Sequence, residues 1–141
     1  MTFASNKPNK RRTMKRNENI LTKVEFEVMS IIWELDKPAC AWDVVNAWAE
    51  PRPAYTTVAT YLKVLYEKGY LDFTKTKGEG KTHMYVALVT RAEYTRRTMQ
   101  DVKKNFFGGS LKSMFSYFVR EEKLTAEEIR ELLSTLNEGQ E

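Results

Sequence analysis

Apolar residues recur three and four positions apart between residues 22 and 36, a spacing that predicts an amphipathic helix. Thr22 and Glu25 have the spacing of a capping box, so we expect the helix to begin at Thr22. Pro38 follows its far end and prevents the helix from continuing. Further apolar residues widen the stripe, which predicts that much of this helix is buried.

Two more helices are predicted before residue 70. The first covers about residues 41–49, and one of its faces carries Trp42, Val45 and Trp48. Pro51 and Pro53 then force a turn, because proline has no backbone N–H with which to continue a helix. The next helix covers residues 55–68 and is stopped by Gly69. Its apolar residues Val58, Leu62 and Leu65 lie on one face.

The opposite face of helix 55–68 is short and polar. It carries Thr56, Ala59, Thr60 and Lys63. A helix that enters a DNA groove needs such a face, because small side chains allow close approach, hydroxyls bond phosphates or base edges, and lysine meets a phosphate. Three short helices with a tight break before the third are also the layout of a helix-turn-helix.

Residues 70–75 and 82–88 alternate between apolar and polar side chains, which is the period of half-buried strands. In the second segment, Met84, Val86 and Leu88 share one side. Gly78 and Gly80 mark a turn between the segments, and its basic residues are Lys75, Lys77 and Lys81. The pattern predicts a mostly α winged helix-turn-helix, whose wing at residues 75–83 lies over a phosphate backbone or a minor groove.

Three further helices are predicted between residues 91 and 137. The first runs to about Phe107, and Ser110 and Thr125 cap the other two. Their large apolar residues are Leu111, Met114, Phe115, Phe118, Ile129, Leu132, Leu133 and Leu136. A piece this small has little interior of its own, so these side chains pack either against a second copy of the chain or back on the first domain. We favour a two-fold dimer, because a DNA reader with one short recognition helix gains affinity by doubling.

The pattern divides the chain into an N-terminal arm (1–19), a winged-helix DNA-binding domain (20–90), a helical dimerisation domain (91–137) and a short tail (138–141). The net charge of +4 is unevenly distributed, because residues 1–17 hold six of the 23 basic residues and none of the 19 acidic ones. The arm is therefore expected to be a disordered basic segment. It either binds DNA loosely or has no role.

The remaining composition argues against several classes of protein. No apolar run approaches the ~18 residues of a membrane span. The single Cys40 permits no internal disulfide, so we expect a cytoplasmic protein; Cys40 is either a buried structural thiol or a redox switch. The single His83 has no second ligand nearby, so no metal and no other cofactor is expected. The chain has no apparent pair of a nucleophile and a base and no phosphate-binding loop, so we do not expect the protein to be an enzyme.

Over about residues 20–137, the chain resembles the penicillinase repressor family. The matching stretches are Leu21–Glu25, Val28–Met29 and Ile32–Trp33 in the first helix, Tyr55–Val58, Leu62, Leu65 and Glu67–Leu71 in and after the third, and the glycine break Gly108–Leu111. The resemblance implies a homodimeric repressor whose winged helix binds a palindromic operator and whose C-terminal helices pair the two chains. By position, the base-facing residues would be Thr56, Thr57, Ala59, Thr60 and Lys63. Ala59 stands where some members have a longer polar side chain, which implies less direct base readout or a different operator.

The family also includes copper-responsive repressors with a Cys-rich tail, and β-lactam-responsive repressors that are cut at an Asn-Phe bond in the linker helix. This chain ends in Asn137–Glu141 without a cysteine, which argues against copper sensing. It contains Asn105–Phe106, but Gln100–Asp101 stand at the matching place when the glycines are aligned. Release by a regulatory protease is therefore an open alternative.

We therefore expect a homodimeric transcriptional repressor that binds a palindromic operator in double-stranded DNA. The residues expected at the DNA are Tyr55, Thr56, Thr57, Ala59, Thr60, Lys63, Lys77 and Lys81. The alternative is a winged-helix protein-interaction module whose basic patch binds an acidic partner. The exposed face of helix 55–68 favours DNA, because a protein-binding face would present a large apolar anchor.

Overall fold

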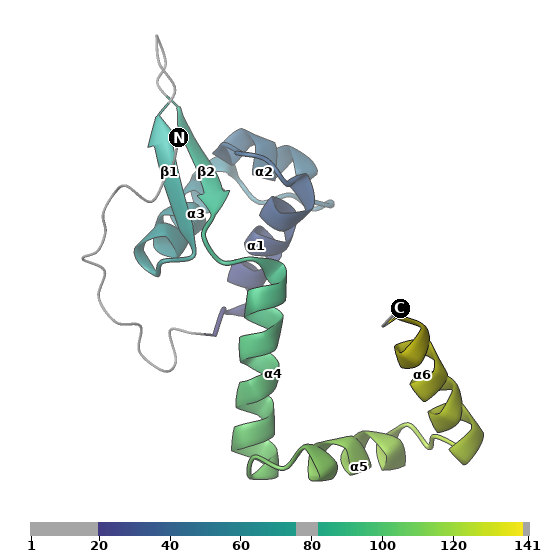
Figure 1. Cartoon of the computed structure of the whole chain (residues 1–141). Coiled ribbons are helices and arrows are strands. Elements are labelled where there is room, and N and C mark those ends of the chain that lie inside the picture. Colours follow the sequence, from purple (N-terminus) through teal and green to yellow (C-terminus); the bar gives the residue numbers. More distant parts are fainter. Residues whose placement is uncertain (1–19, 76–81, 140–141) are drawn as a thin grey trace. The chain divides into compact units, whose positions relative to one another are not determined.

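The computed structural model describes residues 20–75 and 82–139. The chain divides into two compact units, and the boundary falls between Thr95 and Arg96. The described residues form six helices and a two-stranded antiparallel sheet (Figure 1). This confirms the predicted fold class, a mostly α winged helix-turn-helix followed by a helical part.

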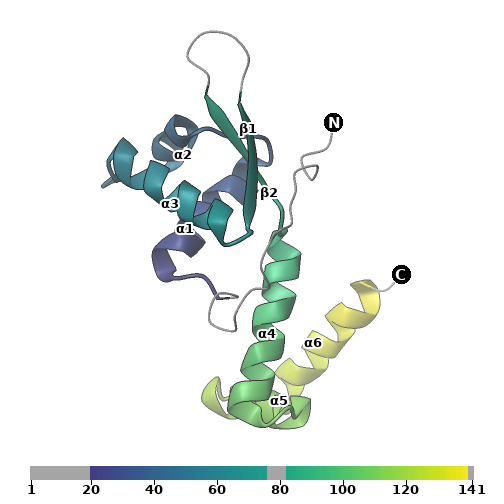
Figure 2. The same cartoon turned by 90° about the vertical axis from the view of Figure 1, so that its left-hand side faces the viewer.

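The N-terminal unit holds three helices, one hairpin and the start of a fourth helix (Figure 2). Their bounds are Lys23–Leu35 for α1, Ala41–Ala47 for α2, Tyr55–Glu67 for α3, Leu71–Lys75 for β1, His83–Ala87 for β2 and Arg91–Phe107 for α4. In the hairpin, Leu71 lies opposite Ala87 and Lys75 opposite His83. Ala39, between α1 and α2, adds an isolated bridge to Tyr85 through backbone hydrogen bonds of 3.0 and 2.7 Å.

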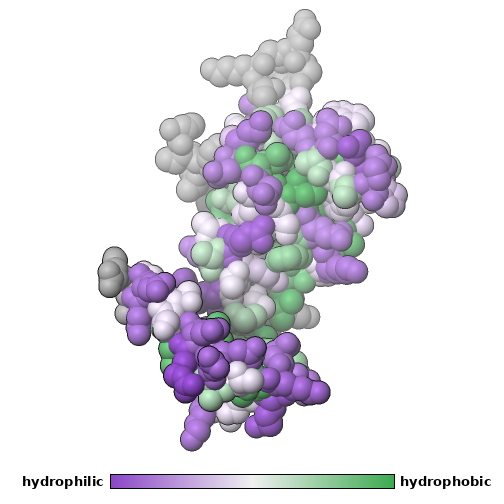
Figure 3. Space-filling view, turned by 90° about the vertical axis from the view of Figure 1, so that its right-hand side faces the viewer, coloured by the Kyte–Doolittle hydropathy of each residue, from purple (hydrophilic) through white to green (hydrophobic). Residues whose placement is uncertain are grey.

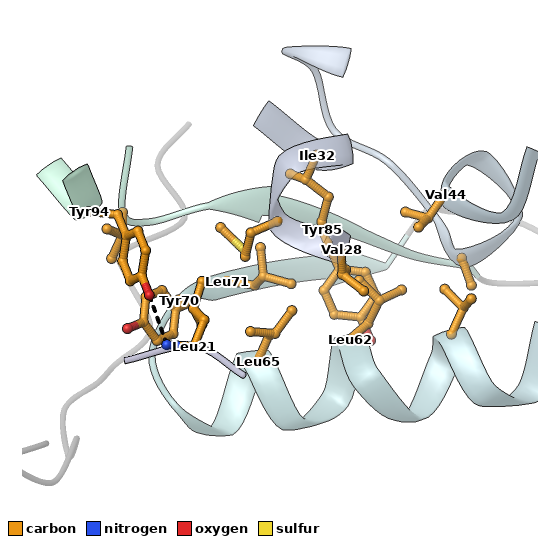
Figure 4. Close-up of a cluster of buried hydrophobic side chains, with 14 of the residues drawn as sticks. Leu21, Val28, Ile32, Val44, Leu62, Leu65, Tyr70, Leu71, Tyr85 and Tyr94 are labelled. Atoms are coloured by element: carbon orange, nitrogen blue, oxygen red, sulfur yellow. Dashed lines mark hydrogen bonds between the residues drawn. The ribbon is translucent and has the colours of Figure 1, made fainter. Parts of the chain in front are cut away.

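One apolar core holds these elements together (Figure 4). Its fully buried side chains are Val28, Met29, Val44, Val58, Leu62, Leu65, Tyr70 and Leu71. They come from all three helices and from the start of the hairpin, so each element is oriented by its own apolar stripe. The Tyr94 hydroxyl of α4 accepts a buried hydrogen bond from the Leu21 amide at 2.9 Å, which joins the beginning of the unit to its end (Figure 4).

The predicted helix ends are formed by the expected side chains. Thr22 and Glu25 make the reciprocal capping box of α1, with bonds of 3.0 and 3.2 Å. At the other end of α3, Gly69 has φ +90°, a conformation that favours glycine. The Gly69 amide donates to the Tyr66 carbonyl and the Tyr70 amide to the Leu65 carbonyl, which together form a Schellman motif.

Glu25 also makes an ion pair that links α1 to the end of α3. The Lys68 ammonium donates to both carboxylate oxygens, at 2.8 and 2.9 Å. Both side chains are largely shielded, with 9% of the Glu25 side chain and 20% of the Lys68 side chain exposed. Burial alone would raise the pKa of the Glu25 carboxyl, but the hydrogen bonds and charge of Lys68 and the bonds from Thr22 outweigh it and lower the pKa below its ordinary value.

Several details differ from the expectations. Helix α2 ends at Ala47, so it is shorter than predicted, and Trp42 points away from the core, with 55% of its surface exposed. Tyr85 is the buried residue of β2, whereas Met84 and Val86 are half-buried and Leu88 is exposed. Tyr85 packs in the core, and its backbone also bridges to Ala39, between α1 and α2. Phe26 on α1 is also exposed, and it contacts the rings of Trp33 and Tyr94.

The C-terminal unit consists of the rest of α4 with α5, Leu111–Glu121, and α6, Ala126–Gly139. Ser110 caps α5, and a reciprocal Thr125–Glu128 capping box begins α6, as predicted. Gly108 and Gly109, both at positive φ, end α4. None of residues 96–139 is buried in the single chain, so this unit has helices but no core of its own.

We predict that Glu25→Gln lowers the free energy of unfolding at pH 7 by about 1–3 kcal/mol, because a charged hydrogen-bonded pair is lost while glutamine can still form the capping box. Because the folded-state pKa of Glu25 is lowered, the contribution of the pair is complete above the unfolded-state pKa and disappears as pH falls through the folded-state value. Urea unfolding of both proteins from pH 7 downwards measures this. A stability difference that stayed constant throughout that acid range would contradict the assignment.

Candidate nucleic-acid interface

Helix α3 is oriented by the three side chains that it buries. Val58, Leu62 and Leu65 are each 0% exposed, which leaves the other side of the helix open to solvent. On that side, Thr56, Thr57, Thr60 and Lys63 are exposed, and Ala59 is half-buried. The structure therefore brings these five predicted residues to the accessible side of α3, and the sixth, Tyr55, is exposed at the start of the helix.

The threonines of this surface differ in their hydrogen bonding. The Thr60 hydroxyl donates to the Thr56 carbonyl at 3.0 Å, so its proton is engaged and its oxygen remains able to accept. The hydroxyls of Thr56 and Thr57 have no partner among residues 20–75 and 82–139. The surface can thus both donate and accept, as contacts to phosphates and base edges require.

The basic side chains around α3 differ in whether they are free to contact a ligand. Lys63 is exposed and has no acidic partner in the described part of the chain, and Lys75 is exposed at the end of β1. Arg52 is engaged, because its guanidinium donates to the Trp48 and Asn46 carbonyls and lies 3.7 Å from the Glu50 carboxylate. The predicted wing residues Lys77 and Lys81 lie outside the described residues.

The environment of Trp42 is not revealed by its helical spacing. Its ring stacks on that of Tyr55, with centroids 4.7 Å apart and an angle of 29° between the planes. Tyr55 is the first residue of α3, and 41% of its surface is exposed. An aromatic pair therefore stands at the surface where α2 meets the beginning of α3. Pro51 and Pro53 limit how far α2 can extend, but the helical pattern does not show that Trp42 meets Tyr55.

The base of the wing is packed by aromatic rings. The ring of Phe73 meets that of Tyr66 on α3, with centroids 4.9 Å apart, and stacks on that of His83, with centroids 4.3 Å apart. His83 is thus engaged in packing, and the described residues contain no cluster of three His, Cys, Asp or Glu side chains that could hold a metal. Burial raises the pKa of the Tyr85 hydroxyl, and the nearby phenol of Tyr55 raises it further.

The predicted dimerisation residues form an exposed apolar surface on α5 and α6. Met114 and Ile129 are half-buried, and the others are exposed: Leu111, Phe115, Phe118, Leu132, Leu133 and Leu136. Hydrophobic side chains accordingly interrupt the polar surface of these helices (Figure 3). Single exposed apolar residues are normal on a protein surface, so the six exposed ones on these two helices stand out by their number.

None of the helices in the described residues combines the length and hydrophobicity that crossing a membrane requires.

Comparison with known proteins gives a consistent result. The profile of the penicillinase repressor family matches residues 21–138. The methicillin resistance regulatory protein MecI of Mammaliicoccus sciuri is 30% identical over 118 residues, covering 83% of this chain and 93% of the relative. The penicillinase repressor of Bacillus licheniformis is 28% identical over 123 residues, covering 84% and 90%. The penicillinase repressor of Staphylococcus aureus is 25% identical over 118 residues, covering 84% and 91%.

Proposed function

Because the chain belongs to the penicillinase repressor family, we propose that it is a homodimeric transcriptional repressor that binds an inverted repeat in double-stranded DNA. The observation that carries the proposal is the exposed surface of α3, with three threonines, one alanine and an unpaired lysine. The surface suits a major groove, in which a recognition helix places short polar side chains against base edges. The regulator has no enzymatic role in this proposal.

In this arrangement Thr56, Thr57, Ala59 and Thr60 contact bases and Lys63 neutralises a phosphate. Tyr55 lies at the edge of the groove, and the wing residues Lys77 and Lys81 follow the backbone. The proposal assigns residues 20–90 to DNA binding and residues 91–137 to pairing the chains, so that two copies of α3 meet half-sites about one helical turn apart.

The proposal assigns the apolar surface of α5 and α6 to the second copy of the chain. Two features support this. No residue between 96 and 139 is fully buried in the single chain. Helix-turn-helix proteins that bind palindromic DNA do so as two-fold symmetric dimers. A regulatory protease that cut α4 would separate the pairing helices from the DNA-binding domain and so release the operator. The exposed Phe106, beside Asn105 near the end of α4, marks one candidate bond.

Selection of duplexes from random-sequence DNA by the purified chain, at two salt concentrations, tests the proposal. The expected result is an inverted repeat with half-sites about one turn apart, whose affinity survives the higher salt. If no motif were recovered and binding fell steeply as salt was added, the chain would bind DNA only by non-specific attraction to its phosphates. A module that binds an acidic protein through its basic patch would then be the better explanation.

We predict that Lys63→Ala weakens binding to all duplexes about equally and reduces the slope of log K against log[salt] by about 2 per dimer, one for each lost phosphate contact. Affinities measured between about 50 and 200 mM salt provide the slope. An unchanged slope would show that Lys63 is not at a phosphate.

We predict that Thr60→Val changes the preferred base at one position of each half-site by about 1 kcal/mol, because the accepting oxygen is lost while the branched shape is kept. The matched control is Thr135→Val on α6, since the Thr135 hydroxyl donates to the Glu131 carbonyl in the same way, at 3.1 Å. Repeating the selection with each variant reads out the preference. Equal effects of the two variants would remove Thr60 from base readout.

We predict that Leu133→Asp converts the dimer to a monomer and weakens operator binding by at least about tenfold, because a carboxylate would be buried in an apolar interface. Ser134→Asp, at the adjacent exposed position of α6, is the matched control and should remain dimeric. Sedimentation equilibrium gives the mass of each variant. A wild-type chain that sediments as a monomer would contradict the pairing role of α5 and α6.

A further inference from the structure

The exposed Trp42–Tyr55 stack lies beside the α3 residues assigned to the bases, and Trp42 has no role in the function proposed above. The two rings stack on one another at the surface, with 55% of Trp42 and 41% of Tyr55 exposed, and each combines an apolar ring with a polar group that can donate a hydrogen bond. The Trp42 indole N–H and the Tyr55 hydroxyl make no hydrogen bond with any other described residue. The pair therefore offers apolar ring surface together with two unused polar groups.

Resting on the proposed function, we propose that Trp42 and Tyr55 form an uncharged contact to the sugar–phosphate backbone of the operator, beside the groove that α3 enters. The indole N–H and the phenol O–H donate to phosphate oxygens, and the stacked rings cover the adjoining deoxyribose. The contact places α3 in the groove and carries no sequence preference of its own.

The position of the stack favours DNA as its partner. Tyr55 begins α3, so the pair is continuous with the groove-facing surface. Trp42 belongs to α2, and in a helix-turn-helix the helix before the recognition helix crosses the backbone. Phosphates and sugars take half or more of all protein–DNA hydrogen bonds, and tyrosine is among their usual donors.

The charges near the stack indicate that the contact is neutral. Trp42 and Tyr55 carry no charge when they donate, and Arg52, on the turn between α2 and α3, is held by Trp48, Asn46 and Glu50. A neutral donor displaces no condensed counterion, so its contribution to affinity is independent of salt. This separates the stack from Lys63, whose contribution falls as salt is added.

The test measures binding of the full chain to the duplex that the wild type selects. Trp42→Phe removes the indole N–H and keeps a ring, Trp42→Ala removes both, and Tyr55→Phe removes only the hydroxyl. Tyr66→Phe is the matched control, because Tyr66 lies on the same helix with 42% of its surface exposed, against 41% for Tyr55. Thermal unfolding verifies that each variant is folded, which the exposure of Trp42 leads us to expect.

We expect Trp42→Phe and Tyr55→Phe each to weaken binding by about three- to tenfold, the usual effect of one lost hydrogen bond. Trp42→Ala should weaken it by more than tenfold, and Tyr66→Phe should have no effect. The slope against log[salt] and the selected sequence should stay those of the wild type. Ethylation of single phosphates should also identify phosphate positions at which the modification weakens binding of the wild type but no longer weakens binding of Trp42→Phe.

Wild-type affinity in Trp42→Ala and Tyr55→Phe would overturn the inference while leaving the repressor proposal intact. A reduced salt slope in either variant would also overturn it, because the contact would then be ionic. Failure of the wild-type chain to select any duplex would overturn both proposals together.

Discussion

Burial of one face of α3 is the constraint on which the candidate interface depends. Val58, Leu62 and Leu65 have no exposed surface, so the helix cannot rotate without opening the core, and the open side is held where it is. The Schellman motif at Gly69 and the Glu25–Lys68 ion pair hold the end of the same helix. The proposed DNA-binding surface is therefore presented by a helix whose orientation the core fixes.

The sequence predicted those features that short-range chemistry determines. The capping boxes at Thr22 and Thr125 and the glycine stop after α3 each involve residues within about six positions of one another, and the structure confirms them. The stripe of α3 was also correct, because three buried residues at helical spacing leave little choice of face. The mostly α winged helix followed from the order of these elements.

Features that depend on distant partners were predicted less well. Which side of β2 faces inward depends on the core formed by the helices, against which Tyr85 packs, and the alternation alone does not reveal it. The exposure of Trp42 depends on where α2 stops and on the ring of Tyr55, which lies on another helix. The spacing of Trp42, Val45 and Trp48 places the three residues on one face of a helix, and it does not show how exposed each of them is.

The lack of any buried residue between residues 96 and 139 has a consequence for how much folded protein a cell contains. Helices without a fully buried residue within one chain gain much of their stability from whatever covers them, so that stability rises with the concentration of the covering molecule. If a second copy is the cover, newly made chains at low abundance are the least stable and the most exposed to proteolysis. The amount of regulator would then increase more steeply than its rate of synthesis, and the fold itself would set a threshold for control.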